Sequence, residues 1–161
     1  MKLLYATSLT FPSGLANRMQ IMAMAKEFSK QMENNFWFGV SKMDTKPEGM
    51  QVVPFGIMKS YVLSWKYLKY LQKNTISHVY CREPRLLFFL QCYNFLFFRL
   101  PLVFIYEIHA TPHGGVINIL FEKILVRTTT VLIFITTHLK KIYQKQYGVK
   151  NKRVIIASDP V

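Results

Sequence analysis

The sequence predicts an α/β domain in which helices cover both faces of a mostly parallel sheet, and three observations lead to this fold class. The chain has 161 residues, which is close to the size of one domain. Short strand-like runs alternate with helix-like segments almost throughout its length. The strand-like runs are apolar at consecutive positions, as in a parallel sheet that is buried on both sides. Together these features predict one Rossmann-like, three-layer α/β/α domain over residues 1–161.

The first half of the chain begins with an expected strand, the apolar run Met1–Thr7, which leads into the turn-rich loop Ser8–Gly14. Leu15–Met32 then carries apolar residues at helical spacing. Ser13 and Gly14 stand where an N-cap and a tight entry turn belong. The other elements expected in this half are strands over Phe36–Val40, Gln51–Phe55 and His78–Cys81, and a basic, aromatic helix over Tyr61–Gln72.

The second half repeats the alternation of helices and strands. Pro84 is expected to open a helix that runs to about Phe98, because proline is tolerated in the first helical turn. Gly148 is expected to end the last helix. The remaining elements are helices over Val116–Arg127 and Thr137–Tyr147, and strands over Leu102–Tyr106, Val131–Ile135 and Arg153–Ile156.

One apolar stretch, Leu86–Tyr106, has the length of a transmembrane helix. Polar residues and a proline interrupt it at Gln91, Asn94, Arg99 and Pro101. The residues after Pro101 are also typical of a strand rather than a helix. The stretch therefore predicts a buried helix followed by a central strand.

Composition narrows the class of protein. Fifty-one per cent of the residues are hydrophobic and 18 per cent are charged, which excludes a disordered chain. The formal net charge of +13 indicates an anionic neighbour such as a phosphorylated ligand, nucleic acid or an acidic membrane. Cys81 and Cys92 cannot form a disulfide scaffold and show no zinc-binding spacing, so we expect a cytoplasmic protein without a metal site.

The basic residues gather in two runs that contain no acid, from Gly49 to Arg82 and from His138 to Arg153. Aromatic residues interleave with the lysines of the first run, so that Tyr61–Lys73 resembles an amphipathic helix that lies on an anionic membrane surface. A solvated basic face explains the same pattern. The aromatic residues of Tyr61–Lys73 are Tyr61, Trp65, Tyr67 and Tyr70.

Polar side chains follow the expected strands where ligands bind in open parallel sheets, beyond the carboxyl ends. Gly14 opens the first helix, whose free N–H groups suit a phosphate, although a plain turn glycine has the same spacing. His109 follows an apolar strand and could contact a sugar hydroxyl or transfer a proton, or could be structural. Arg82 and Glu83 could bind substrate or pair with each other.

Three segments, in this order, resemble a known family: the loop FPSGLANRMQIMAMAKEFSKQ, the strand and loop VFIYEIHATP, and the helix IFITTHLKKIYQKQYGV. The chain is similar to the N-terminal domain of retaining glycosyltransferases of the GT-B fold, family 4 type. The matching features are the loop glycine Gly14, the E-x-H segment with Glu107 and His109, and the threonine-started helix that ends at Gly148.

The resemblance implies transfer of a sugar from a nucleotide-sugar donor to a glycan or lipid-linked acceptor, with retention and without a metal or other cofactor. It places Gly14 against the donor diphosphate and His109, as the catalytic residue, near the transferred sugar. It also implies that this chain is the acceptor-side half of the enzyme, without the donor-binding second domain. The further residues expected to bind substrate are Ser13, Asn17, Arg18, Arg82 and Glu107.

Two other functions remain open at this point. The basic, aromatic surface could belong to a module that binds nucleic acid, although no RNP, KH or zinc-finger signature is present and nucleic acid is therefore not the expected partner. A flavodoxin-like regulatory domain would call for an acidic cluster at the strand ends, where acids are few. The fold alone does not choose among these functions.

Overall fold

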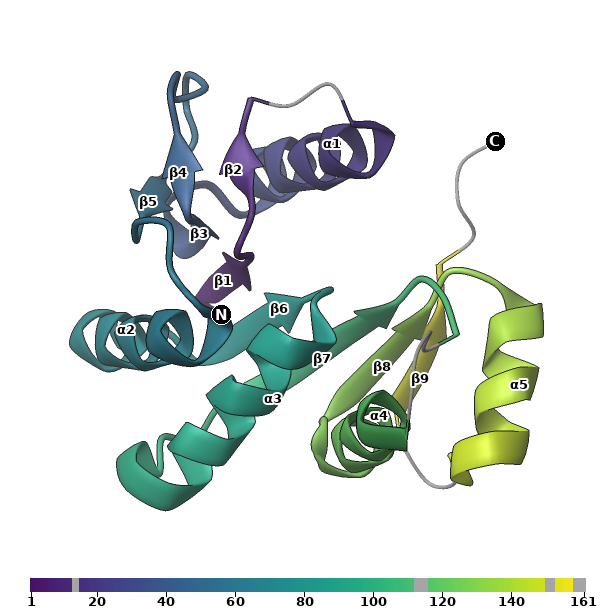
Figure 1. Cartoon of the computed structure of the whole chain (residues 1–161). Helices are drawn as coiled ribbons and strands as arrows, with labels where there is room; N and C mark the ends of the chain where they lie inside the picture. The colour runs from purple at the N-terminus through teal and green to yellow at the C-terminus, as the bar shows by residue number, and fades with distance from the viewer. Residues whose placement is uncertain (13–14, 112–115, 150–152, 158–161) are drawn as a thin grey trace.

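The computed structural model describes residues 1–12, 15–111, 116–149 and 153–157 (Figure 1). At its centre lies a seven-stranded sheet in which every neighbouring pair of strands is parallel. The Rossmann-like prediction is therefore confirmed. In spatial order the strands are β5 (Val52–Pro54), β3 (Phe36–Val40), β1 (Leu3–Ala6), β6 (His78–Cys81), β7 (Val103–Ile108), β8 (Val131–Phe134) and β9 (Arg153–Ile156).

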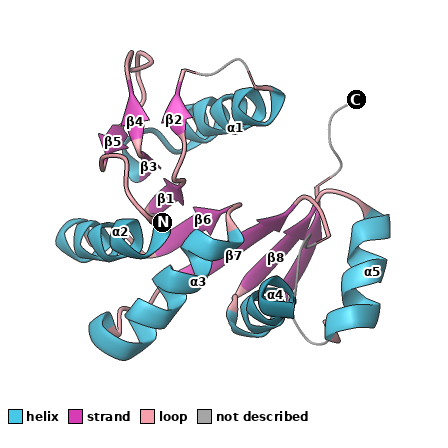
Figure 2. Cartoon of the chain, viewed as in Figure 1, coloured by secondary structure: helices cyan, strands magenta, loops and turns pink. Residues whose placement is uncertain are grey.

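Helices flank the sheet on both faces (Figure 2). Helix α1 packs on one face, and the buried residues of α2 to α5 pack on the other. A single turn of 3₁₀-helix follows α1, and a π-helical turn, η2, follows α3. The helices are α1 (Ala16–Met32), η1 (Glu33–Asn35), α2 (Ser60–Asn74), α3 (Pro84–Tyr93), η2 (Asn94–Phe98), α4 (Val116–Thr128) and α5 (Thr137–Tyr147).

Alternation along β1 shows why the strands are apolar at every position. Leu4 and Ala6 point into the core beneath α2 and α3, whereas Leu3 and Tyr5 point into the core beneath α1. All four side chains are at most 3 per cent exposed. Successive side chains of a strand point to opposite faces of the sheet. A sheet that is covered on both faces therefore needs apolar residues at odd and even positions of its strands.

Several local signals act as the sequence predicts. Pro84 lies in the first turn of α3. The hydroxyl of Thr136 accepts a hydrogen bond from Leu139 N–H and caps α5, which ends at Gly148 in the left-handed conformation. Helix α1, in contrast, has Leu15 as its N-cap, while Ser13 and Gly14 lie outside the described residues.

The 21-residue apolar stretch divides as expected. Its first part is α3 and the π-helical turn, and its last part enters β7. Among the residues that the structure describes, no helix is both long and apolar enough to cross a membrane. One feature was not predicted: β2 (Thr10–Phe11) and β4 (Lys42–Met43) pair in a small second sheet within segments expected to be loops.

Helix α2 is more deeply packed than its composition suggests. Tyr67 is fully buried, and Tyr70 packs edge-on against Phe55 with its ring partly covered. Of the four aromatic residues expected on an interfacial face, Tyr61 is exposed and Trp65 is half-buried. The membrane-facing interpretation of the Tyr61–Lys73 face is therefore wrong for Tyr67, whereas Tyr70 keeps part of its surface exposed.

The strand order places a crevice in the middle of the sheet. The chain first builds outward from β1 through β3 to β5, then returns to β6 and builds in the opposite direction to β9. The connections on either side of β1 and β6 therefore diverge at the carboxyl ends of these two strands. This topological switch point is where open α/β sheets bind ligands.

Candidate functional site

Three charged or polar side chains meet at the carboxyl edge of the sheet: Arg82 directly after β6, Glu107 near the end of β7, and His109 directly after β7. Nη2 of Arg82 donates a hydrogen bond to Nδ1 of His109 at 2.6 Å. Nε of Arg82 lies 3.6 Å from Oε1 of Glu107, and Nε2 of His109 contacts the same carboxylate oxygen. Two of the residues expected to bind substrate, Arg82 and Glu107, and the expected catalytic residue, His109, are therefore in one cluster.

The charges in this cluster constrain the histidine. Because a guanidinium can only donate, Nδ1 of His109 is the acceptor in its contact with Arg82, and Nε2 of the same ring faces Glu107. The side chains of Arg82 and Glu107 are 9 and 5 per cent exposed, and that of His109 is 26 per cent exposed. The histidine is therefore the member of the cluster that presents most surface to a ligand.

The strand geometry explains why these residues share one face. Tyr80 and Ile105 point toward α1. Glu107 lies two residues after Ile105 on β7, so its side chain points to the same face of the sheet. Tyr5 is on this face too, and burial raises the pKa of its hydroxyl despite the nearby Arg82 guanidinium. The Tyr5 hydroxyl and Oε2 of Glu107 are buried and have no hydrogen-bond partner within the described residues.

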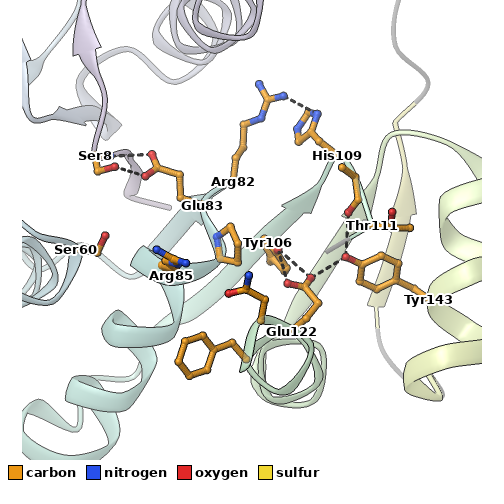
Figure 3. A pocket seen from close by; sticks show the side chains of 14 residues that line it. Ser8, Ser60, Arg82, Glu83, Arg85, Tyr106, His109, Thr111, Glu122 and Tyr143 are labelled. Atoms are coloured by element: carbon orange, nitrogen blue, oxygen red, sulfur yellow. Dashed lines mark hydrogen bonds between the residues drawn. The ribbon is translucent and has the colours of Figure 1, made fainter. Parts of the chain in front are cut away.

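Two hollows open beside the cluster, and both are lined by Arg82 and His109. The α4-side hollow, of about 510 Å³, is shown in Figure 3 and also contains Arg85, Tyr106 and Glu122. The α1-side hollow, of about 440 Å³, has a largely apolar wall and also contains Glu107. Its apolar lining residues are Ala23, Met24, Phe28, Tyr80, Ile133, Ile135 and Ala157.

Glu83 occupies the switch point between β1 and β6. Its Oε1 accepts a hydrogen bond from Ser8 N–H at 2.8 Å, and its carboxylate also accepts from the Ser8 hydroxyl (Figure 3). The Thr7 hydroxyl donates to the same carboxylate. Arg82 and Glu83 do not pair with each other, because Arg82 is engaged by Glu107 and His109. Arg82 and Glu83 therefore belong to two separate networks of polar contacts, and the pair that the sequence left open does not form.

A second acid in the α4-side hollow was not predicted. Glu122 is 2 per cent exposed and accepts hydrogen bonds from the hydroxyls of Tyr106 at 3.0 Å and Tyr143 at 2.9 Å. The Tyr143 hydroxyl also lies 3.1 Å from the carbonyl oxygen of Ala110. Burial raises the pKa of Glu122 above its usual value, and the two tyrosine hydrogen bonds offset part of that rise. The carboxyl therefore holds its proton more readily than an exposed glutamate.

Glu122 has a signal in the sequence that could have found it. It is the single acid in the apolar helix VINILFEKILVRT, and a lone acid among buried positions needs polar partners. Its partners could not be found in this way, because Tyr106 and Tyr143 come from a strand and a helix elsewhere in the chain.

The other predicted site residues do not join the cluster. Arg18 is partly buried, and its guanidinium donates to the carbonyl oxygen of Thr10 at 3.3 Å. Asn17 lies in the first turn of α1, but its side chain is outside the described part, as are Ser13 and Gly14. Within the described ranges no group of three or more His, Cys, Asp or Glu residues is arranged to hold a metal ion.

Comparison with known proteins identifies solved structures that share this fold. No family model and no curated protein matches the sequence, but solved structures of Rossmann-like proteins match the fold over nearly the whole chain. HepE of Anabaena in complex with UDP superposes with a TM-score of 0.67 at 14% identity, covering 98% of this chain and 44% of that one. Its complex with UDP-glucose gives the same TM-score and coverage at 16% identity.

A sucrose-phosphate synthase from Thermosynechococcus elongatus matches with a TM-score of 0.66 at 9% identity. That match covers 99% of this chain and 89% of the synthase structure. The present chain therefore spans less than half of the HepE chain and most of the synthase structure. At these low identities the likeness concerns the fold.

Proposed function

We propose that this chain is the acceptor-side domain of a glycosyltransferase that moves a sugar from a nucleotide-sugar donor to a glycan or lipid-linked acceptor. The observation that carries the proposal is the Arg82–Glu107–His109 cluster at the carboxyl edge of a sheet with this strand order. The structural neighbours support it, because one is bound to UDP-glucose and another is a sucrose-phosphate synthase. We infer retention at the anomeric carbon from the sequence resemblance.

The donor diphosphate is proposed to lie at the start of α1, beside Gly14. Helix α1 follows β1, so its N-terminal end faces the carboxyl edge of the sheet, where its free N–H groups suit a phosphate. Gln20 of α1 lines the same hollow as Arg82 and His109. A ligand that spans from the helix start to the cluster would place its phosphates and its sugar at these two points.

His109 would contact the transferred sugar. Arg82 and Glu107 engage the two ring nitrogens and thereby fix the plane of the ring before substrate arrives. A residue held in this way can position a hydroxyl without reorganising during the reaction. Arg82 adds a positive charge beside the α1-side hollow, where it would stabilise the negative charge that develops on the departing diphosphate.

A second domain is proposed to complete the donor site. The described site supplies one wall with two open hollows, and HepE, a structural neighbour that binds UDP, is more than twice as long as this chain. Closure by a second wall would exclude water and strengthen the electrostatic contacts. We expect the 161-residue chain alone to bind nucleotide-sugars only weakly, and calorimetry that gave a micromolar Kd would contradict this half-site geometry.

The site is also proposed to work without a metal or other cofactor, in the cytoplasm and in peripheral contact with an anionic membrane. Chelation with EDTA should then leave turnover unchanged. A loss of activity that Mg²⁺ or Mn²⁺ restores would reject the metal-free part of the proposal.

The test of the reaction uses the protein expressed from its complete reading frame, a panel of nucleotide-sugars, and detection of the released nucleoside diphosphate. His109→Ala should lower kcat by roughly 10- to 1000-fold if the side chain contacts the sugar in the transition state. His78→Ala is the matched control, because His78 begins β6 at the opposite edge of the sheet and its Nδ1 pairs with Ser77.

Three results would each contradict a part of the proposal. Release of no nucleoside diphosphate from any donor would reject the glycosyltransferase assignment. A fully active His109→Ala enzyme would make His109 a structural residue, and an inverted anomeric configuration in the product, read by NMR, would reject retention.

A further inference from the structure

The outer surface between α2 and α3 carries a continuous row of aromatic rings. Tyr61 contacts Phe89 with ring centroids 6.1 Å apart, and Phe89 contacts Tyr93 at 6.1 Å. Tyr93 contacts Phe97 at 6.1 Å, and Trp65 lies against Tyr93 and Phe97 at 5.7 and 5.5 Å. We call these five residues the aromatic seam. Their ring contacts join the two helices along the outside of the domain.

The seam ends at an exposed apolar tip on the π-helical turn, residues 95–97. Phe95 is 79 per cent, Leu96 58 per cent and Phe97 62 per cent exposed. Single exposed apolar side chains are ordinary, but three in succession beside a row of aromatic rings form a patch of the kind that marks a binding surface.

The tip is held in place by its own turn. The side chain of Asn94 donates to Leu100 O and accepts from Leu100 N–H, both at 3.0 Å. Arg99 adopts the left-handed conformation and its N–H donates to Asn94 O at 2.6 Å. These bonds close the loop at its base, so the tip is ordered before it meets a partner and the entropy cost of binding is lower.

Positive charge is concentrated on the segments that carry the seam. Residues 49–106 contain seven basic residues and a single acid, Glu83, whose carboxylate is occupied by Thr7 and Ser8. Nζ of Lys69 lies 5.9 Å from the centroid of the Trp65 ring. The exposed basic residues on the seam's two helices and the following turn are Lys66, Lys69, Lys73, Arg85 and Arg99.

We propose that the aromatic seam and the tip dock on an anionic lipid surface. A lipid interface accommodates both the apolar tip and the aromatic seam with its basic residues. Apolar tips enter the acyl boundary, while aromatic rings and basic residues remain at the head groups. A second copy of this chain would bring like charges together, and a nucleic-acid duplex, whose bases are stacked inside, would leave the exposed phenylalanines and leucine without an apolar partner. The charge and the apolar tip together favour the lipid.

The seam also indicates which class of acceptor the proposed glycosyltransferase would use. This step rests on the proposed function. Tyr61 is the end of the seam farthest from the tip, and its neighbour Ser60 lines the α4-side hollow together with Arg85. A domain lying on its seam would hold this hollow beside the lipid head groups. The acceptor class is then an amphiphile whose polar head enters the hollow while its apolar tail stays in the membrane.

The experiment measures binding of the protein, expressed from its complete reading frame, to vesicles of phosphatidylcholine alone and with 30 per cent phosphatidylglycerol, by co-sedimentation. We expect binding to the acidic vesicles, weakening steeply with salt. The double substitution Lys69→Gln/Lys73→Gln should weaken it on the order of 30-fold. Phe95→Ser/Phe97→Ser should weaken it at least about 10-fold, since both side chains would leave the acyl boundary.

Met19→Ser is the matched control, because Met19 is 61 per cent exposed on α1, on the opposite face of the sheet. It should leave vesicle binding unchanged. Circular dichroism and thermal unfolding of every variant establish that the fold is intact.

Several results would overturn the lipid surface: no vesicle binding by the folded protein, equal binding to both kinds of vesicle, or a control variant as weak as the tip variant. A dimer in sedimentation, or DNA binding, that the tip substitutions abolish while vesicle binding persists would assign the surface to that other partner. Vesicle binding needs no donor, so a protein that binds vesicles but turns over no nucleotide-sugar rejects the proposed function alone. Transfer to a soluble acceptor only, with vesicle binding intact, rejects the amphiphilic acceptor.

Discussion

Replacing Gly39 by alanine would disturb the contact that holds helix α2 over the end of β1. A Cβ atom at position 39 would lie 2.3 Å from Cε1 and 2.9 Å from Cζ of Tyr67. Tyr67 is fully buried, its hydroxyl donates to Thr7 O at 2.8 Å, and the same hydroxyl accepts from Thr7 N–H at 3.2 Å. The strand position therefore requires glycine because the tyrosine ring occupies the space of a side chain.

The magnitude follows from the displacement that alanine forces. Ordinary contact begins at 3.4 Å, so the ring must move by about 1.1 Å, enough to lose its hydrogen bond to Thr7. Overpacking of a core costs about 1–3 kcal/mol, and a lost buried hydrogen bond adds about 1 kcal/mol. We expect Gly39→Ala to lower the free energy of unfolding by about 2–4 kcal/mol and Tm by at least about 5 °C.

Urea denaturation of a double-mutant cycle measures this contact. Tyr67→Leu removes the ring, so the added cost of alanine at position 39 should fall below about 1 kcal/mol in that background. Gly39→Ala that costs the same in both backgrounds would refute the reasoning, as would a single variant within about 0.5 kcal/mol of the wild type.

The remaining predictions concern buried polar contacts. Burial raises the pKa of Glu122, so the stability that this group supplies is present below its unfolded pKa and is lost as pH rises through its folded pKa. Glu122→Gln should therefore unfold at a higher temperature than the wild type at neutral pH, with the difference disappearing in acid; a difference independent of pH would contradict this. Glu83→Ala leaves the Ser8 N–H without its acceptor and should cost about 1–3 kcal/mol in urea, whereas a neutral change would show that water replaces the carboxylate. Asn94→Ala should speed hydrogen exchange at Leu100 N–H, and unchanged protection would mean that Asn94 does not hold the turn.

Part of the site was already visible in the sequence. His109, Arg82 and Glu107 follow or end apolar runs, and the carboxyl ends of parallel strands meet at one edge, so their proximity could be expected. The contacts among these three side chains could not be expected, because they depend on β6 and β7 being adjacent and on all three side chains lining the α1-side hollow. The two-residue strands β2 and β4 were missed for a related reason: each is too short to show a period.

Local patterns in the chain predict the helices, the seven strands of the main sheet and their order along the chain, because hydrophobic periodicity, a first-turn proline at Pro84 and a terminal glycine at Gly148 act over a few residues of backbone. Which polar and aromatic groups meet depends on the tertiary packing. Glu83 bonds to Ser8 across 75 positions, and Tyr143 reaches Glu122 across 21. Such partners are set by strand order and by the packing of helices on a chosen face, and neither leaves a local pattern in the chain.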